Sequence, residues 1–204
     1  GPEAGKALAT SRRVAKEMCE TLSSHWGIAV HDFDHKSPAE LIRTLITCRG
    51  NGANLLLNAG PQASGALTDI DRATLARIGE WIQETIGEGL YSGRPAAVKA
   101  SGGDLVLGDG DRYYYAAFSL PIRNYHSLFK GKDDWDRRSV IGDMPPVRSI
   151  RWMDNGEELA FTQDVGEGLL TFKSTANPYG SQFVVRFAEL ADLAGDVERR
   201  VQAD

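Results

Sequence analysis

A short apolar run, ANLLLN at residues 53–58, constrains the fold of this chain more than any other feature. Three consecutive leucines are too few for a helix and too uniformly apolar for a strand with one face in water. Such a run is typical of a strand covered on both faces, as in a parallel sheet between helices or in a closed barrel. Gly60 and Pro61 follow it and predict a turn at the end of the strand.

Amphipathic helices are expected on both sides of this strand. Ser37 as a cap and Pro38 in the first turn predict a helix over 38–48. Thr68 is the expected cap of a second helix over 69–86. Helix, buried strand, loop and helix make up the repeating unit of a (β/α) barrel, in which the loops after the strands carry the chemistry. The unit is visible only about twice, whereas a closed barrel needs about eight, so we expect the chain to be the C-terminal part of a barrel protein.

The pattern changes after residue 93. Short β-rich runs alternate with turn residues at a spacing of about 8–12 positions, which favours an antiparallel β-sandwich. The runs expected to be strands are 96–100, 104–107, 112–119, 147–153, 158–163, 169–173 and 182–188. Residues 124–146, which contain KGKDD and a Pro-Pro pair, are expected to form a long surface loop.

The predicted fold class is therefore α/β plus all-β. The last βα units of a TIM-like barrel are expected over 1–93, an antiparallel β-sandwich over 94–190, and a short charged helix in the tail at 191–204.

Charge and composition narrow the classes of function. A net charge of −5 argues against nucleic acid or a polybasic membrane surface as a partner. No apolar run approaches the roughly 18 residues of a membrane span. The two cysteines, Cys19 and Cys48, lack metal-site spacing and are expected to be reduced and buried. The first 20 residues lack the apolar segment of a signal peptide. The compartment stays open, and secreted, periplasmic and lysosomal-type locations are all compatible with the chain.

Three segments match the motifs of one enzyme family in order and spacing. EMCETLSSHWG at 17–27 is similar to W-E-T-C-M-T-L-N-x-S-W-G-Y, and the segment 53–67 is similar to G-N-L-L-L-N-V-G-P-x-x-D-G-x-I. IGEWI followed by GLY, within 78–91, is similar to I-G-E-W-L…G-E-A-I-Y. Together they resemble the α-L-fucosidases of glycoside hydrolase family twenty-nine. A β-sandwich follows the barrel in that family too, although over 94–190 only the domain type and a final FVVRF run match.

The resemblance implies retaining hydrolysis of α-L-fucosides. A retaining glycosidase uses two carboxyl groups about 5–5.5 Å apart, one as nucleophile and one as acid/base. The family's acid/base often lies in a T-P-E-Q segment about fifteen residues before the W-E-T-C motif. Glu3, in a Pro-Glu pair fourteen residues before Glu17, matches that position and is the acid/base candidate, with Glu17 as its rival. No residue matches the nucleophilic Asp or the sugar-binding histidines, which we expect on a missing N-terminal portion.

Three further residues are candidates for the sugar site. Trp26 aligns with an aromatic residue that packs on the methyl face of fucose in the family, and a core tryptophan is the alternative. His25 beside it is either a hydrogen-bond donor to sugar or an ordinary surface histidine. Asn58 ends the central strand, where it would serve the site or cap the following turn.

Other polar and aromatic clusters have simpler interpretations. HDFDH at 31–35 is expected to be a solvated loop, since the resemblance implies no metal and no cofactor. Tyr113–Tyr115 are expected to pack in a core, with a carbohydrate platform as the alternative. Trp135 lies in a polar loop, where it could contact a partner or a ligand.

The resemblance thus implies part of a retaining α-L-fucosidase, which removes terminal α-linked L-fucose from glycans by double displacement. Its expected partners are a fucosylated glycan and a companion N-terminal barrel fragment or chain, because two βα units would leave apolar faces in water. The alternative function is a non-catalytic carbohydrate-binding or scaffolding β-sandwich with a barrel remnant. Linkage preference and oligomeric state do not follow from the sequence.

Overall fold

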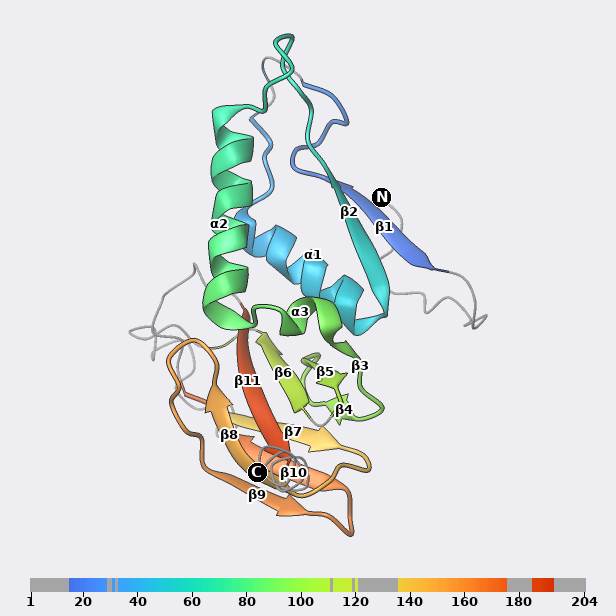
Figure 1. Cartoon of the computed structure of the whole chain (residues 1–204), viewed down its shortest axis with the longest axis vertical. Coiled ribbons are helices and arrows are strands. Elements are labelled where there is room, and N and C mark those ends of the chain that lie inside the picture. Colours follow the sequence, from blue (N-terminus) through green and yellow to red (C-terminus); the bar gives the residue numbers. More distant parts are fainter. Residues whose placement is uncertain are drawn as a thin grey trace, which may run out of the picture.

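The computed structural model describes residues 15–28, 31, 33–110, 112–118, 120, 136–175 and 185–192. Its first part contains two strands and three helices (Figure 1): β1 (Lys16–Thr21), α1 (Pro38–Gly50), β2 (Ala53–Asn58), α2 (Asp69–Thr85) and α3 (Gly89–Ser92). β1 and β2 pair in parallel, with Lys16 opposite Ala53 and Thr21 opposite Asn58. The carboxyl ends of both strands therefore meet at the same edge. Within the described ranges, no helix is long and apolar enough to cross a membrane.

Local signals start the two long helices where the sequence predicts. The Ser37 hydroxyl accepts a hydrogen bond from the Glu40 backbone N–H at 3.2 Å, and the Thr68 hydroxyl accepts one from the Asp71 N–H at 3.1 Å. Each bond satisfies one of the free N–H groups of the first helical turn. Both predicted caps are confirmed, and the helices end within two residues of the expected positions.

The apolar run of β2 is covered on one face only, which differs from the two-sided burial that its sequence predicts. Leu57 packs against the core beneath the helices. Leu56 points the other way and is 49% exposed, and its partner across the sheet, Cys19, is also exposed. The described part of the chain places no layer over this face. The predicted burial of Cys19 is therefore wrong, whereas Cys48, on α1, is buried as expected.

The described residues after α3 form two antiparallel sheets (Figure 1). The five-stranded sheet has the order β3-β5-β6-β11-β8 and contains β3 (Arg94–Pro95), β5 (Leu105–Asp109), β6 (Arg112–Phe118), β11 (Val185–Asp192) and β8 (Val147–Trp152). The four-stranded sheet has the order β4-β7-β10-β9 and contains β4 (Lys99–Ala100), β7 (Arg137–Ile141), β10 (Leu169–Lys173) and β9 (Phe161–Asp164). The pattern of short strands and turns is confirmed for most of the predicted runs.

Two strands lie outside the predicted runs: the two-residue β3, just before the first run, and β7. β7 (Arg137–Ile141) lies between β4 and β10, in the part of the sequence expected to be a surface loop at 124–146. Two arginines at its start hide the strand pattern. Arg138 is nevertheless mostly covered, because its guanidinium bonds the buried Asp104 carboxylate at 3.1 Å. A charged pair thus takes a core position that apolar periodicity cannot detect.

Two hydrophobic cores lie on opposite faces of the five-stranded sheet. One joins the helices to this sheet, and the Trp81 ring of α2 lies 5.9 Å from the Phe187 ring of β11. The Trp81 indole N–H also donates to the Val185 carbonyl at 3.3 Å. The other core joins the two antiparallel sheets, where Tyr115 meets Phe172 edge-on at 4.9 Å. The five-stranded sheet is therefore the middle layer between the helices and the four-stranded sheet.

A buried ion pair lies within this middle layer. The Arg186 guanidinium donates two hydrogen bonds to the Asp154 carboxylate, at 2.7 and 2.8 Å. The two side chains are 0% and 4% exposed, and the guanidinium lies 4.1 Å from the centre of the Trp152 ring. Bidentate geometry and the aromatic face together compensate for the loss of water around the charge.

Removing Asp154 should therefore be costly. We expect Asp154→Ala to lower the free energy of unfolding by about 3–5 kcal/mol, because it leaves a buried guanidinium without its counter-ion. Glu80→Ala is the matched control: its exposed pair with Arg77, at 2.7 Å on α2, should contribute no more than about 0.5 kcal/mol. Equilibrium urea unfolding followed by near-ultraviolet circular dichroism measures both changes. Equal losses in the two variants would contradict the prediction.

Candidate functional site

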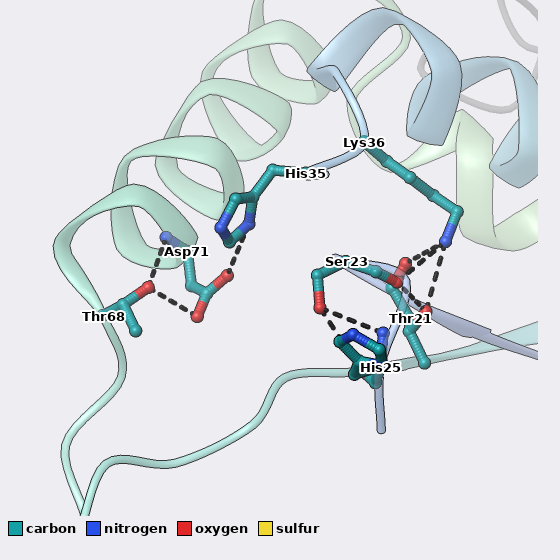
Figure 2. A network of polar contacts seen from close by, with 7 residues as sticks. All are labelled: Thr21, Ser23, His25, His35, Lys36, Thr68 and Asp71. Carbon is teal, nitrogen blue, oxygen red and sulfur yellow. Dashed lines mark hydrogen bonds and ion pairs between the residues drawn. The ribbon is translucent and has the colours of Figure 1, made fainter. Parts of the chain in front are cut away.

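Polar side chains gather where β1 and β2 end. Figure 2 shows them on the segment after β1, on the residues before α1 and on the first turn of α2: Thr21, Ser23, His25, His35, Lys36, Thr68 and Asp71. The parallel register brings these segments together, since the chain leaves both strands at the same edge. In βα architectures this edge is where binding and catalytic groups are usually found.

Lys36 holds the end of β1. Its ammonium group donates to the Thr21 carbonyl at 2.9 Å, to the Thr21 hydroxyl at 3.1 Å and to the Ser23 carbonyl at 3.1 Å (Figure 2). It also lies 3.0 Å from the Glu20 carboxylate. The Thr21 hydroxyl donates in turn to the Ser23 carbonyl. One cation therefore fixes the backbone at the point where the chain leaves the strand.

Glu20 completes this cluster. Its carboxylate accepts the Thr21 backbone N–H at 2.9 Å. This hydrogen bond is the main reason that the pKa of Glu20 lies below its usual value of 4.5; partial burial opposes the shift and Lys36 adds to it. Glu20 therefore stays ionised and serves as the counter-ion of Lys36.

His35 and Asp71 connect the start of α2 to this edge. The Asp71 carboxylate accepts the Thr68 hydroxyl at 2.6 Å, and its other oxygen lies 3.8 Å from Nδ1 of His35 (Figure 2). His35 also forms an isolated antiparallel bridge with Ser23. The helix cap, the residues before α1 and the end of β1 thus form one polar unit.

Trp26 and His25 lie together on the segment that follows β1. The Trp26 side chain is 63% exposed, and His25 is exposed beside it. The Ser23 hydroxyl and the His25 backbone exchange hydrogen bonds of 3.3 and 3.4 Å (Figure 2). The Trp26 carbonyl accepts a hydrogen bond from the Asn58 side-chain amide at 2.7 Å. An exposed indole is available to a ligand, whereas a core tryptophan would not be.

Of the two carboxylate candidates, the structure describes only Glu17, which lies outside this cluster. Glu17 lies near the amino end of β1, where its carboxylate accepts the Asn54 side-chain amide at 2.9 Å. Four residues separate it from Thr21, which is about 13 Å along a strand, and Trp26 follows beyond that end. Glu3 lies outside the described residues. The structure therefore brings Trp26, His25 and Asn58 together and leaves Glu17 at the opposite end.

The remaining candidates are core or loop residues. Tyr114 and Tyr115 are buried and Tyr113 packs beside them, in agreement with the expected core role. Phe33, in the expected solvated loop, is 90% exposed. Trp135 lies outside the described residues. In the part of the chain that the structure describes, no group of three or more His, Cys, Asp or Glu side chains is placed to hold a metal ion.

A separate concavity of about 380 Å³ lies on the four-stranded sheet. Its polar lining includes Asp136, Thr162, Thr171 and Lys173, and Lys173 pairs with Asp136 at 3.2 Å. Its size falls within the range of small-ligand sites. The sequence does not predict this concavity, because the alternation of apolar residues in a strand identifies only the face that is buried.

Comparison with known proteins relates the chain to one family. The family model described as Alpha-L-fucosidase matches residues 4–87. The tissue α-L-fucosidase of Mus musculus is 30% identical over 162 residues, which cover 76% of this chain and 33% of that protein. Residues 4–87 are thus similar to part of the α-L-fucosidase family.

Other α-L-fucosidases agree with this assignment. The tissue enzyme of Rattus norvegicus is 28% identical over 131 residues, 64% of this chain and 26% of that protein. The structure of α-L-fucosidase isoenzyme 1 from Paenibacillus thiaminolyticus superimposes with a TM-score of 0.68 at 24% identity, over 86% of this chain and 39% of that one. A trapped covalent intermediate of a family 29 α-L-fucosidase from Bacteroides thetaiotaomicron gives a TM-score of 0.66 at 22% identity, over 85% and 37%. The chain therefore spans about a fifth to two fifths of the length of the α-L-fucosidases that it matches.

The ion pair of Lys36 with Glu20 makes the stability of the folded chain depend on pH. Because the pKa of Glu20 is lowered in the folded chain, its contribution to stability is present above pH 4.5 and is lost as the pH falls through the folded-state pKa. Lys36→Met should raise the titration midpoint of Glu20 but leave it below 4.5, because the Thr21 N–H still donates. Carboxyl ¹³C NMR titration measures the midpoint.

The control for this titration is Lys16→Met, which removes a lysine at the other end of β1, near the Asn51 carbonyl. It should leave the Glu20 midpoint in place. A Glu20 midpoint that does not move in Lys36→Met would mean that this ion pair does not influence the carboxylate.

Proposed function

We propose that this chain is the C-terminal portion of a retaining α-L-fucosidase that hydrolyses terminal α-linked L-fucose from glycans. In this proposal residues 1–93 supply the last βα units of the catalytic (β/α) barrel, residues 94–190 form a β-sandwich and residues 191–204 are a tail. The family match, the partial coverage of every relative considered and the order of elements support it. The whole enzyme's activity would require the remainder of the barrel.

The observation that carries the proposal is the uncovered face of the β1–β2 pair. Parallel strands normally have both faces buried, since helices cover one side and a second layer covers the other. Here α1 and α2 lie over one face (Figure 1), as helices do on the outside of a barrel. The opposite face carries exposed Cys19 and Leu56 at its centre. We assign this face to the interior of the barrel, where side chains from the other strands would pack against it.

The proposed chemistry takes place beyond the carboxyl ends of these strands. A nucleophilic Asp on the N-terminal portion attacks the anomeric carbon, while Glu3 gives its proton to the leaving glycosidic oxygen. Glu3 then takes a proton from water, which attacks the same carbon and releases fucose and the carboxylate. The trapped covalent intermediate of the Bacteroides thetaiotaomicron enzyme supports this route.

In this proposal Trp26 and His25 contact the sugar, and Glu17 is structural. The exposed Trp26 indole offers a flat apolar surface to the methyl face of fucose, and His25 is a hydrogen-bond donor to a hydroxyl group. Glu17 pairs with Asn54 at the amino end of β1, about 13 Å of strand from the edge where the sugar would bind.

Complementation tests the assignment of Glu3. The chain, mixed with a fragment carrying the first barrel strands, should cleave an aryl α-L-fucoside, and Glu3→Gln should lower kcat/KM by about 10²–10⁴-fold, because the leaving oxygen loses its proton donor. Glu17→Gln is the matched control and should change kcat/KM by less than about threefold, since a factor of three is below 1 kcal/mol. The reverse ranking of the two variants would make Glu17 the acid/base, and inactivity of every mixture would refute the proposed function.

Thiol alkylation tests the uncovered face directly. Cys19 is exposed and should react with iodoacetamide in the isolated chain, whereas Cys48 is buried and burial raises its pKa, so it should react slowly. Seating of the companion fragment should slow the alkylation of Cys19 by at least about tenfold, because only the thiolate that reaches solvent reacts. Mass spectrometry of the two peptides gives both rates. An active complex in which Cys19 reacts at its original rate would contradict the docking face.

The concavity on the four-stranded sheet supports a second candidate, a non-catalytic carbohydrate-binding or scaffolding module. Hydroxyl groups of Thr162 and Thr171 line it beside the Lys173–Asp136 pair. The same mixtures discriminate between the two candidates. Glycan binding by the chain alone, lost in Lys173→Ala and unaffected by the companion, would favour the module.

A further inference from the structure

We propose that Asn58 and Gly60 form a positioning pair that sets the place of Trp26 at the carboxyl edge of the β1–β2 sheet. The inference rests on the proposed function, in which Trp26 contacts the methyl face of fucose. It gives Asn58 a role that is neither sugar binding nor turn capping: Asn58 acts through Trp26.

Asn58 connects the end of β2 to the Trp26 segment by two hydrogen bonds of different kinds. Its backbone carbonyl accepts the Leu22 N–H at 3.0 Å, which extends the parallel ladder by one bond. Its side-chain amide donates to the Trp26 carbonyl at 2.7 Å. The first bond fixes where the segment leaves β1, and the second fixes the peptide that follows Trp26.

Gly60 lets the same segment approach the chain after β2. A Cβ atom at position 60 would lie 2.5 Å from the Gly27 carbonyl carbon and 2.6 Å from the Ile28 nitrogen. Both neighbours are backbone atoms, so no side-chain rotation could relieve the contact. The requirement for glycine is steric, because the two backbones touch.

The two contacts act on adjacent peptide units. Asn58 holds the carbonyl of Trp26, and Gly60 lies against the atoms that come immediately after it. Trp26 is 63% exposed, so much of its surface has no contact with the rest of the chain. The place of the indole therefore depends on where the Trp26 backbone lies. Asn58 at the end of β2 and Gly60 in the following turn set the position of that backbone.

A misplaced indole has a specific chemical consequence. Contact with one methyl group is worth roughly 10–200-fold in discrimination between substrates. The tested quantity is the ratio of kcat/KM for an aryl α-L-fucoside to kcat/KM for the same glycoside without the C5 methyl group. A variant that only lowers the amount of folded enzyme reduces kcat/KM for both glycosides by the same factor and leaves this ratio unchanged.

Asn58→Asp tests the inference with little change in shape, because it removes the donor and places a negative charge beside the Trp26 carbonyl. Asn54→Asp is the matched control: it makes the same substitution in the same strand, near the amino end. The complemented complex carrying Asn58→Asp should lose discrimination by at least about fivefold, toward the value of Trp26→Ala, which is within the range of one methyl contact. Asn54→Asp should retain the wild-type ratio.

A second measurement does not depend on activity. The order parameter of the Gly27 amide, from ¹⁵N relaxation of the 204-residue chain, should fall from about 0.85 to below about 0.6 in Asn58→Asp and stay high in Asn54→Asp. Gly60→Ala should displace the Gly27 amide resonance, whereas Gly79→Ala, whose Cβ meets nothing within 4 Å, should not. An unchanged order parameter or an unchanged ratio in an active Asn58→Asp complex would overturn the positioning role. A wild-type complex inactive on both glycosides would instead refute the proposed function, and with it the sugar role of Trp26.

Discussion

The parallel pairing of β1 with β2 is the interaction on which the candidate site depends. Antiparallel strands would send successive loops to opposite edges, whereas parallel strands release both loops at the same edge. Thr21 therefore lies opposite Asn58, and the segments that follow them are within hydrogen-bonding reach. The bond from Asn58 to the Trp26 carbonyl spans 32 positions of sequence and exists only because of this register.

The strand pair is held in place by contacts with the antiparallel sheets, far from the polar edge. A Cβ atom on Gly50, at the end of α1, would lie 2.6 Å from the Leu105 side chain, so the helix packs closely on the five-stranded sheet. The neighbouring Arg49 guanidinium donates to three carbonyls in and after α3, those of Leu90, Tyr91 and Gly93. On α2, Trp81 packs against Phe187. These contacts link the helices firmly to the middle layer, so the sheets support the edge where the site is proposed without contributing side chains to it.

The sequence predicts the features whose causes are local. Ser37 and Thr68 cap their helices through N–H groups three residues away, so their role is readable from spacing alone. β7 escapes prediction because only Val140 contributes an apolar side chain to the core, while Arg138 pairs with Asp104, 34 residues away. The role of Asn58 is hidden for a related reason. Its partner is a backbone carbonyl, and a carbonyl has no residue identity that a motif could record.

The side chains on the uncovered face of the β1–β2 pair change from polar to apolar and back to polar along the strands, whereas a non-specific apolar surface would be apolar throughout. Polar Glu17 and Asn54 lie opposite each other at one end, apolar Cys19 and Leu56 occupy the centre, and Thr21 lies at the other end opposite Asn58. Barrel interiors are filled in such layers, each one built from neighbouring strands at the same height. In the proposed barrel, the strands that cover this face would run in the same direction, with apolar side chains at the middle height and polar ones at the two ends. A flat apolar surface of another protein would bury Leu56 but would also take the Glu17 carboxylate out of water with the Asn54 amide as its hydrogen-bond donor, which is a costly arrangement for a charge. The composition of the face therefore fits the proposed barrel strands better than a uniformly apolar surface, and its second polar layer lies at the edge where Trp26 is held.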